Sequence, residues 1–215
     1  MFEKLNREFY RKDAITLAKD LLGKYIVHTV YNETGNNINN VELIGKIIET
    51  EAYMGFHDKG AHTYNGKRTP RTEVMYGEEG HAYIYFVYGM YHCLNVVAAE
   101  EGIAQAVLIR SLEPIKGLEK MSYERFNKPL SELGKKQIIN LTNGPGKLCM
   151  ALNITKDLNG EDLTSNKLYI CDKVLKADSN FKIIESKRIG IDYAEEAKDY
   201  LWRFYIQGNE YVSVL

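Results

Sequence analysis

The sequence IIETEAYMGFHDKGAHTYNGKRTPRT (residues 47–72), followed by HAYIYFVYGMYHCLNVV (residues 81–97), decides how this chain is expected to fold. The isoleucine-rich start of the first segment is typical of a β-strand, and the second segment predicts two strands joined by a turn at YGMY. Between them lie glycines and a proline without periodicity, which indicates a long surface loop of the kind that is functional or disordered. The stretch therefore brings carboxylates, histidines, tyrosines and basic side chains together around two rigid strand segments.

Further strands and helices are predicted on both sides of this stretch. Asp13 is the predicted N-cap of a helix that Gly23 ends, and the polar segment 32–40 predicts a loop or hairpin turn. Three successive strands with short connections favour an antiparallel or mixed sheet over a doubly wound one. The predicted strands are residues 24–31, 41–53, 82–88, 92–100, 104–112, 167–172, 181–191 and 203–215. The predicted helices are residues 14–22, 115–126, 131–141 and 143–154, with a short helical turn at 194–201.

The bulk composition favours one domain, residues 1–215, in a reducing compartment. The 215 residues are 45% apolar, enough to bury a core of their own. Three cysteines lie far apart without a CxxC pair, which argues against a disulfide framework or a cysteine-built zinc site. The N-terminal sequence is too charged for a signal peptide, and no apolar run approaches the roughly 20 residues that span a bilayer. We expect a cytoplasmic protein that does not enter a membrane.

The formal net charge of -1 limits how a nucleic acid could bind. Such a site must come from a local basic face, because the chain has no overall positive charge. The loop sequence KRTPR supplies part of that face. Together with residues from other segments it would form a partial basic rim, made of Lys67, Arg68, Arg71, Arg110, Lys147 and Arg188.

Glu49 and Glu51 are two residues apart, so on a strand they share one face. Most pairs of this kind are solvated surface charges. Here, however, apolar residues surround Glu51, and the strand leads into a glycine-rich loop. A carboxylate at such a rigid edge can act on a bound water.

Six aromatic or imidazole side chains could either pack in the core or form a flat slot. Tyr83 and Tyr85 share one strand face, and Tyr53 comes from a neighbouring strand. Stacking of a nucleic-acid base on such rings contributes roughly 1–3 kcal/mol per base. The residues concerned are Tyr53, His62, Tyr83, Tyr85, Tyr88 and Tyr91.

The carboxylates and histidines of the stretch also allow a metal site as an alternative. Its candidate ligands are Glu49, Glu51, His57, Asp58 and His62, and a metal-dependent hydrolase would use them. Their spacing matches no metal motif such as HExxH, so we expect no bound metal and no cofactor.

Several motifs together resemble the alkyladenine (3-methyladenine) DNA glycosylase family, in its bacterial type without the basic N-terminal extension of vertebrate members. They are IIETEAYMG, AH, TPR, YIYFVYGMYHCLNV, VLIRSLEP, NGPGKLC, RIGI and RFYIQG, and they cover nearly everything from Glu42 onward. The resemblance implies an α/β fold of the α+β type, with a curved, mainly antiparallel sheet, flanking helices and a protruding β-hairpin. It also implies a monomer that acts on damaged double-stranded DNA.

The resemblance further implies a monofunctional glycosylase of base excision repair. Glu51 would activate the water that attacks the sugar, and Arg110 and the Ile189 carbonyl would help to hold that water. No lysine nucleophile is required, so no strand cleavage is expected. A protein that binds damaged DNA without catalysis is the remaining alternative.

The other implied roles concern the flipped base and the DNA. Tyr53, His62 and Tyr85 would sandwich the base, Asn95 would reject the guanine amino group, and Tyr88 would fill the gap in the duplex. Further DNA contacts would come from Met75, Arg68, Arg71, Lys147 and Arg188.

Overall fold

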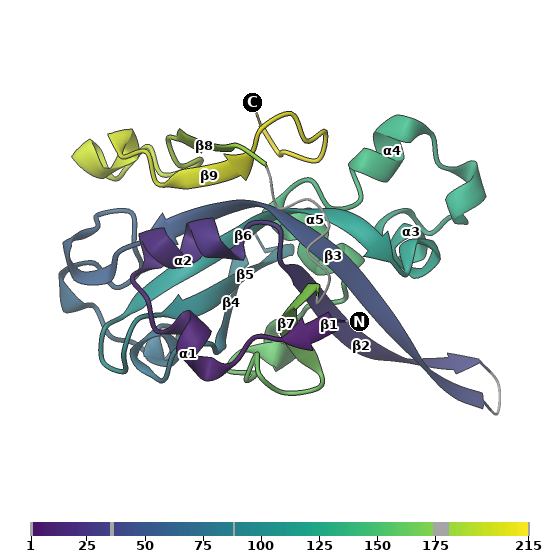
Figure 1. The fold of residues 1–215 in the computed structure, drawn as a ribbon, viewed down its shortest axis with the longest axis horizontal. Helices are drawn as coiled ribbons and strands as arrows, with labels where there is room; N and C mark the ends of the chain where they lie inside the picture. The colour runs from purple at the N-terminus through teal and green to yellow at the C-terminus, as the bar shows by residue number, and fades with distance from the viewer. Residues whose placement is uncertain (1, 35–36, 88, 174–180, 215) are drawn as a thin grey trace.

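Strand β3 is the centre of a large antiparallel sheet in the computed structural model, which describes residues 2–34, 37–87, 89–173 and 181–214. In the described residues the sheet runs in the order β1-β7-β2-β3-β6-β5-β4, and β9 pairs with both β3 and β8. The strands are β1 (Phe2–Lys4), β2 (Tyr25–Thr34), β3 (Asn37–Tyr53), β4 (Ala82–Val87), β5 (Tyr91–Ala98), β6 (Gln105–Lys116), β7 (Leu168–Lys173), β8 (Ile183–Ser186) and β9 (Arg203–Ile206). The α/β fold class and the antiparallel sheet predicted above are confirmed (Figure 1).

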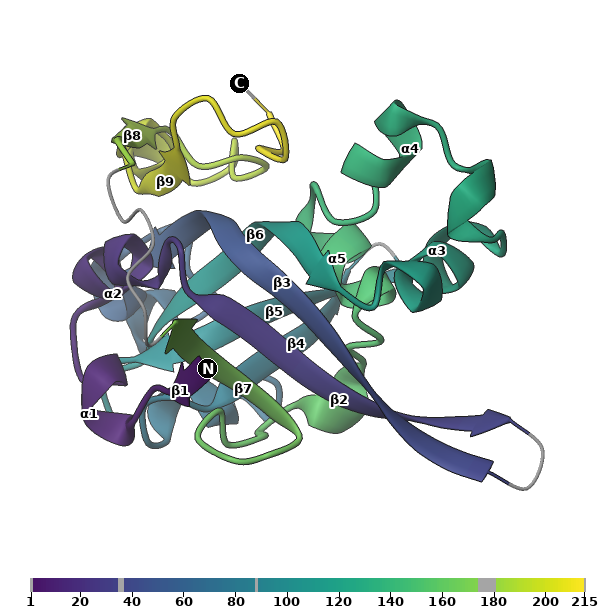
Figure 2. The same ribbon diagram turned by 45° about the vertical axis from the view of Figure 1, so that its right-hand side comes forward.

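β2 and β3 form a hairpin that is longer than predicted. Their pairing runs from Tyr25 opposite Lys46 out to Thr34 opposite Asn37, so much of the predicted loop 32–40 is strand. Figures 1 and 2 show this two-stranded ribbon projecting well beyond the rest of the sheet. The prediction failed there because asparagine disfavours strands, whereas the ladder of backbone hydrogen bonds overrides that preference.

Helix α2 (Ala14–Leu21) fixes the inner face of β3. Asp13 caps it by accepting hydrogen bonds from the amides of Ile15 and Thr16, as predicted. On β3, the Thr50 hydroxyl donates to the Ala18 carbonyl over 2.9 Å. Because neighbouring residues of a strand point to opposite faces, this contact turns the side chains on either side of Thr50 away from the helix.

The other helices are short, and the last of them packs against β5 and β6 inside the sheet. They are α1 (Arg7–Tyr10), α3 (Leu118–Phe126), α4 (Lys135–Ile139) and α5 (Pro145–Ala151). The predicted helix 131–141 is therefore wrong outside its centre, and the predicted strands 181–191 and 203–215 hold only as β8 and β9. Gly190 and Gly208 have φ angles of +77° and +76°, which turn the chain out of the extended conformation.

The long loop from Met54 to Gly80 is built from three short 3₁₀ turns rather than from regular structure. Asp58 anchors its start, because the carboxylate accepts hydrogen bonds from the amides of Met54 and Gly60. Asp58 and Arg188 are a fully buried ion pair, with oxygen and nitrogen atoms 2.5 Å apart. The loop is thereby tied to the segment that follows β8.

No helix in the described part of the chain has both the length and the apolar character that a membrane span requires.

Candidate active site

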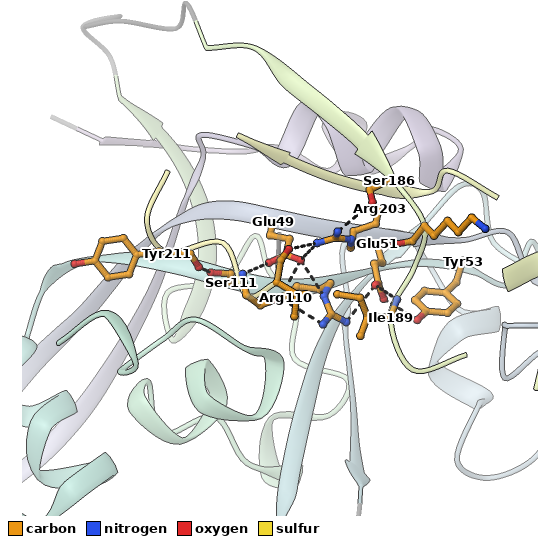
Figure 3. A network of polar contacts seen from close by, with 12 residues as sticks. Glu49, Glu51, Tyr53, Arg110, Ser111, Ser186, Ile189, Arg203 and Tyr211 are labelled. Carbon is orange, nitrogen blue, oxygen red and sulfur yellow. Dashed lines mark hydrogen bonds and ion pairs between the residues drawn. The ribbon is translucent and has the colours of Figure 1, made fainter. Parts of the chain in front are cut away.

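Two irregularities in the pairing of β3 with β6 bring three charged side chains to one place. The register shifts between Ile47 and Glu49 and again between Glu49 and Thr50, so that Ile48 on β3 and Arg110 on β6 are left without direct partners. A residue in such a bulge is re-aimed relative to its neighbours, and bulges are common beside active sites. Arg110 here points at the two carboxylates of β3 (Figure 3).

The Glu51 carboxylate is buried and held at both oxygens. Oε1 accepts hydrogen bonds from the Ile189 amide at 2.7 Å and lies 3.2 Å from Arg110 Nη1. Oε2 accepts from the Tyr53 hydroxyl at 2.9 Å. β9 covers the other side of β3, with Arg203 directly opposite Glu51. The result is a fixed, charged carboxylate in the middle of a sheet.

Burial and the nearby carboxylate charges shift the pKa values of Arg110 and Tyr53. Burial alone would lower the pKa of Arg110, but the charges of Glu51 and Glu49 outweigh burial and raise it. Burial raises the pKa of Tyr53 well above its usual value, and the Glu51 charge adds to this shift. Arg110 therefore stays charged, and Tyr53 keeps the proton that it donates to Glu51.

A pocket of about 560 Å³ opens beside these residues. Volumes of roughly 300–1,000 Å³ are typical of small-molecule sites. Tyr53, Arg110 and Ile189 line the pocket, whereas Glu51 lies directly behind them. The remaining walls are mostly rings and small residues, including His62, Met75, Tyr83, Tyr85, Tyr91, Cys93, Asn95, Gly146 and Tyr193.

Three ring side chains form one wall of the pocket. The rings of His62 and Tyr85 meet edge to face with centroids 4.7 Å apart, and Tyr83 lies 5.4 Å from Tyr85. Arg71 places its guanidinium over the Tyr85 ring at 4.9 Å and donates to His62 Nε2 over 3.2 Å. The Tyr53 ring is packed against Arg188, 4.8 Å from the guanidinium carbon.

His62 is neutral in this arrangement. A guanidinium can only donate, so Nε2 must accept from Arg71, and the hydrogen-bond network assigns the ring proton to Nδ1, 2.9 Å from the Tyr83 hydroxyl. Burial lowers the pKa of His62 to about 4, and the charges of Arg71 and Lys67 act in the same direction.

Asn95 is fixed at the end of the ring wall. Its side-chain nitrogen donates to the backbone carbonyls of Tyr83 at 3.0 Å and Cys93 at 3.4 Å. Both amide hydrogens are thus used inside the protein, and the amide cannot rotate without breaking these bonds. Asn95 is only 3% exposed, although it lines the pocket.

The predicted basic rim is only partly present. Arg68 and Arg71 are exposed, and Arg68 pairs with Glu73. Lys147 is half-buried and donates to Asn143. Arg110 and Arg188 are buried in ion pairs with glutamate and aspartate, so their expected place on an exposed rim is wrong.

Met75 and Tyr88 are two further residues that were expected to touch DNA. Met75 is buried in the pocket wall rather than exposed. Tyr88, expected to wedge into the duplex, lies outside the described residues.

The candidate metal ligands are not gathered into a site. Among the described residues, no three His, Cys, Asp or Glu side chains lie close enough together to hold an ion. Glu49 and Glu51 face arginines, Asp58 faces Arg188, and His57 is exposed beside Phe56.

No role was predicted for Arg203, Ser213, Cys93 or Tyr193, which the fold places at the Glu49 carboxylate or at the pocket. Arg203 and Cys93 lie in the motifs RFYIQG and YIYFVYGMYHCLNV, but neither side chain was assigned a function. Ser213 binds Glu49 across 164 residues, a separation that local patterns do not capture.

Known proteins resemble the chain along nearly its whole length. A family model described as methylpurine-DNA glycosylase matches residues 8–210. A Clostridium acetobutylicum protein named "Putative 3-methyladenine DNA glycosylase" is 57% identical over 212 residues, which cover 99% of this chain and 98% of the relative. Relatives of the same name from Desulfitobacterium hafniense and Clostridium novyi are 52% and 54% identical, covering 99% and 98% of this chain and equal shares of their own.

Proposed function

The chain belongs to the methylpurine-DNA glycosylase family, and we propose that it hydrolyses the N-glycosidic bond of alkylated or deaminated purines in double-stranded DNA. The substrates are of the 3-methyladenine, 7-methylguanine and hypoxanthine class. Each is turned out of the duplex into the pocket before the bond breaks. The observation that carries the proposal is the Glu51 carboxylate, fixed at both oxygens behind a pocket walled by aromatic rings.

Glu51 suits hydrolysis at a sugar carbon for two reasons. Positive charge develops on the sugar as the base leaves, and a buried carboxylate that needs no rearrangement stabilises that charge. The carboxylate can also take a proton from the attacking water. Arg110 and the Ile189 carbonyl are proposed to orient that water, and the contacts of Arg110 and the Ile189 amide with Glu51 Oε1 support this role.

The ring wall suits a purine, and a cationic one in particular. An alkylated purine such as 3-methyladenine carries positive charge, which the electron-rich rings of Tyr85 and Tyr53 attract, although Arg71 and Arg188 already lie over one face of each ring. A protonated histidine would repel such a base, and His62 has a pKa of about 4, so it is neutral at physiological pH. The positive charge of the base also makes it a good leaving group, so little acid catalysis is needed.

Asn95 is proposed to discriminate between purines. Because two backbone carbonyls hold its amide, the side chain keeps its position when a base enters. A purine with an additional amino group would clash with the fixed Asn95 side chain, whereas a mobile side chain could move away from it. The duplex gap left by the flipped base is assigned to Tyr88.

A product assay tests the proposed function. The purified chain, incubated with duplex DNA that contains one 3-methyladenine or hypoxanthine, should release the free base and leave an abasic site. Chelator should not change the rate. Tight lesion binding without free base would instead favour a damage-binding protein, and activity lost in chelator and restored by metal would favour a metal-dependent hydrolase.

A further inference from the structure

Glu49, the neighbour of Glu51 on the same face of β3, is completely buried and accepts four hydrogen bonds. Oε1 accepts from Arg110 Nε at 3.2 Å, from Arg203 Nη1 at 2.8 Å and from the Ser213 hydroxyl at 3.0 Å. Oε2 accepts from the Ser213 amide at 2.7 Å. Glu49 does not line the pocket, so its role must be exerted through its partners.

Arg110 is shared between the two carboxylates. Its Nε faces Glu49, its Nη1 faces Glu51 at 3.2 Å, and its Nη2 donates to the Ser213 hydroxyl at 3.5 Å. One edge of the guanidinium is thus occupied by Glu49 and Ser213. Only Nη1 is directed at Glu51, which leaves Glu51 Oε2 to Tyr53.

The C-terminal segment packs beside Glu49 and its arginine partners. The Ser111 hydroxyl donates to the Tyr211 carbonyl, and Arg203 Nη1 donates to the Val214 carbonyl at 2.9 Å. Arg203 also donates to the Ser186 hydroxyl on β8. Figure 3 shows Arg110 of β6 and Arg203 of β9 both reaching Glu49, with the Ser111–Tyr211 contact beside them.

Stability alone does not account for such a cluster. Two carboxylates and two guanidinium groups, all less than 10% exposed, have been removed from water. Packed apolar residues of similar volume are often as stabilising as buried ion pairs. Resting on the proposed function, we propose that Glu49 is a positioning residue for base release: with Ser213 it holds Arg110 so that a single guanidinium nitrogen faces Glu51.

Without the Glu49 charge, Glu51 becomes the remaining carboxylate partner of Arg110. The guanidinium can then turn to bind both Glu51 oxygens, since a two-pronged pair is favoured over a single contact. The guanidinium would then compete with the Tyr53 hydroxyl for Oε2 and leave the position from which it orients the attacking water. The ring wall would be unaffected, because Glu49 does not touch it.

The test separates base release from lesion binding. Glu49→Gln should lower the single-turnover rate of base release about 10- to 100-fold, the range expected for small displacements of reacting groups. The affinity for lesion-containing duplex should stay within about 3-fold of the original chain, because the pocket walls are retained. A rate equal to that of the original chain would overturn the proposal.

Glu79→Gln is the matched control. Glu79 is also a buried glutamate, 1% exposed and 2.8 Å from an arginine, Arg11, but it does not line the pocket. Its substitution should leave the single-turnover rate unchanged. An equal loss of rate in both variants would mean that general destabilisation, not positioning, explains the effect of Glu49→Gln, and the proposal would fall.

A charge-balanced double variant excludes a second explanation. Glu49→Gln combined with Arg203→Gln removes one negative and one positive charge, so it should recover stability without recovering rate. Recovery of the rate would show that charge balance matters and that Glu49 does not position Arg110. If Glu49→Gln fails to fold, Ser213→Ala replaces it, with an expected rate loss of about 3-fold. Ser213→Ala at full rate would contradict the proposal.

A spectroscopic readout keeps this inference separate from the proposed function. In the intact chain the Arg110 Nε proton is bonded to Glu49, so it should give a slowly exchanging NMR signal that Glu49→Gln removes. This signal does not depend on activity. If the intact chain released no base, the proposed function would fail, whereas an unchanged Arg110 signal in Glu49→Gln would refute the positioning contact itself.

Discussion

His62 links pocket chemistry to pH at the level of a single residue. Its folded pKa of about 4 lies below the ordinary value of 6.5, so the unfolded chain binds the proton more tightly. The neutral ring therefore stabilises the fold fully above pH 6.5. That contribution is lost as the pH falls from about 6.5 towards 4.

His62→Gln should make the free energy of unfolding less dependent on pH in this window. Between pH 7 and pH 4.5 the free energy of unfolding should fall by about 1–3 kcal/mol less in His62→Gln than in the original chain. Urea unfolding at the two pH values measures it. His28 also has a pKa lowered by burial and remains in both proteins, so the comparison isolates His62. Identical pH dependence in both proteins would contradict the conclusion that His62 is neutral in the folded protein.

Asn95 should determine how strongly the protein discriminates between purine lesions. Asn95→Ala removes the fixed amide, so the ratio of release rates for 7-methylguanine and hypoxanthine should shift about 10-fold towards the guanine lesion, the effect of relieving one steric conflict. Parallel single-turnover assays on the two duplexes give this ratio. An unchanged ratio would remove Asn95 from its discriminating role.

The strands near the site were predicted from the sequence, but their pairing irregularities were not. The strand 41–53 and its paired carboxylates were predicted because alternation is a local property of the chain. The bulges at Ile48 and Arg110 were not predicted, because they arise from the register between two strands. Register depends on packing across the whole sheet rather than on either sequence alone.

The buried arginines illustrate the same limit for side chains. Arg188 was predicted to belong to the basic rim that contacts DNA, but Asp58, 130 residues away, binds it in the interior. The C-terminal residues 207–214 were predicted to be strand from their composition. They instead form the turn that brings Ser213 to Glu49.

The Asp58–Arg188 pair supplies a prediction about the loop that starts at Met54. Asp58→Asn leaves a buried guanidinium without its counter-charge, which should lower the free energy of unfolding by about 3–5 kcal/mol. Glu73→Gln breaks an exposed pair with Arg68 and should lower stability far less. Urea unfolding compares the two, and similar losses would contradict the buried role of Asp58.

Charge is unevenly distributed over the whole molecule. Residues 115–147 hold seven basic and three acidic side chains, although the entire chain has a net charge of -1. This segment contains α3, α4 and the start of α5, where Pro145 and Gly146 line the pocket. Figure 2 shows α3 and α4 extending from the side of the sheet where α5 lies.

DNA binding should therefore depend on salt through a few local contacts. We expect the logarithm of lesion-DNA affinity to fall with the logarithm of salt concentration with a slope of about -3 to -5. Lys135→Glu with Lys136→Glu on α4 should weaken binding and flatten this slope, whereas Lys156→Glu, outside the basic segment, should not. Fluorescence anisotropy over a salt series measures both effects. Equal slopes for all three proteins would place the DNA elsewhere.

Glu51 is the residue proposed to activate water for hydrolysis in the ring-walled pocket. Glu51→Gln preserves the side-chain shape and an oxygen that can accept from Ile189, but it removes the charge. The most direct measurement is the single-turnover rate of base release from duplex DNA with one 3-methyladenine or hypoxanthine. The rate should fall at least about 100-fold while lesion binding persists. Full-rate release by Glu51→Gln would rule out Glu51 as the residue that carries out hydrolysis.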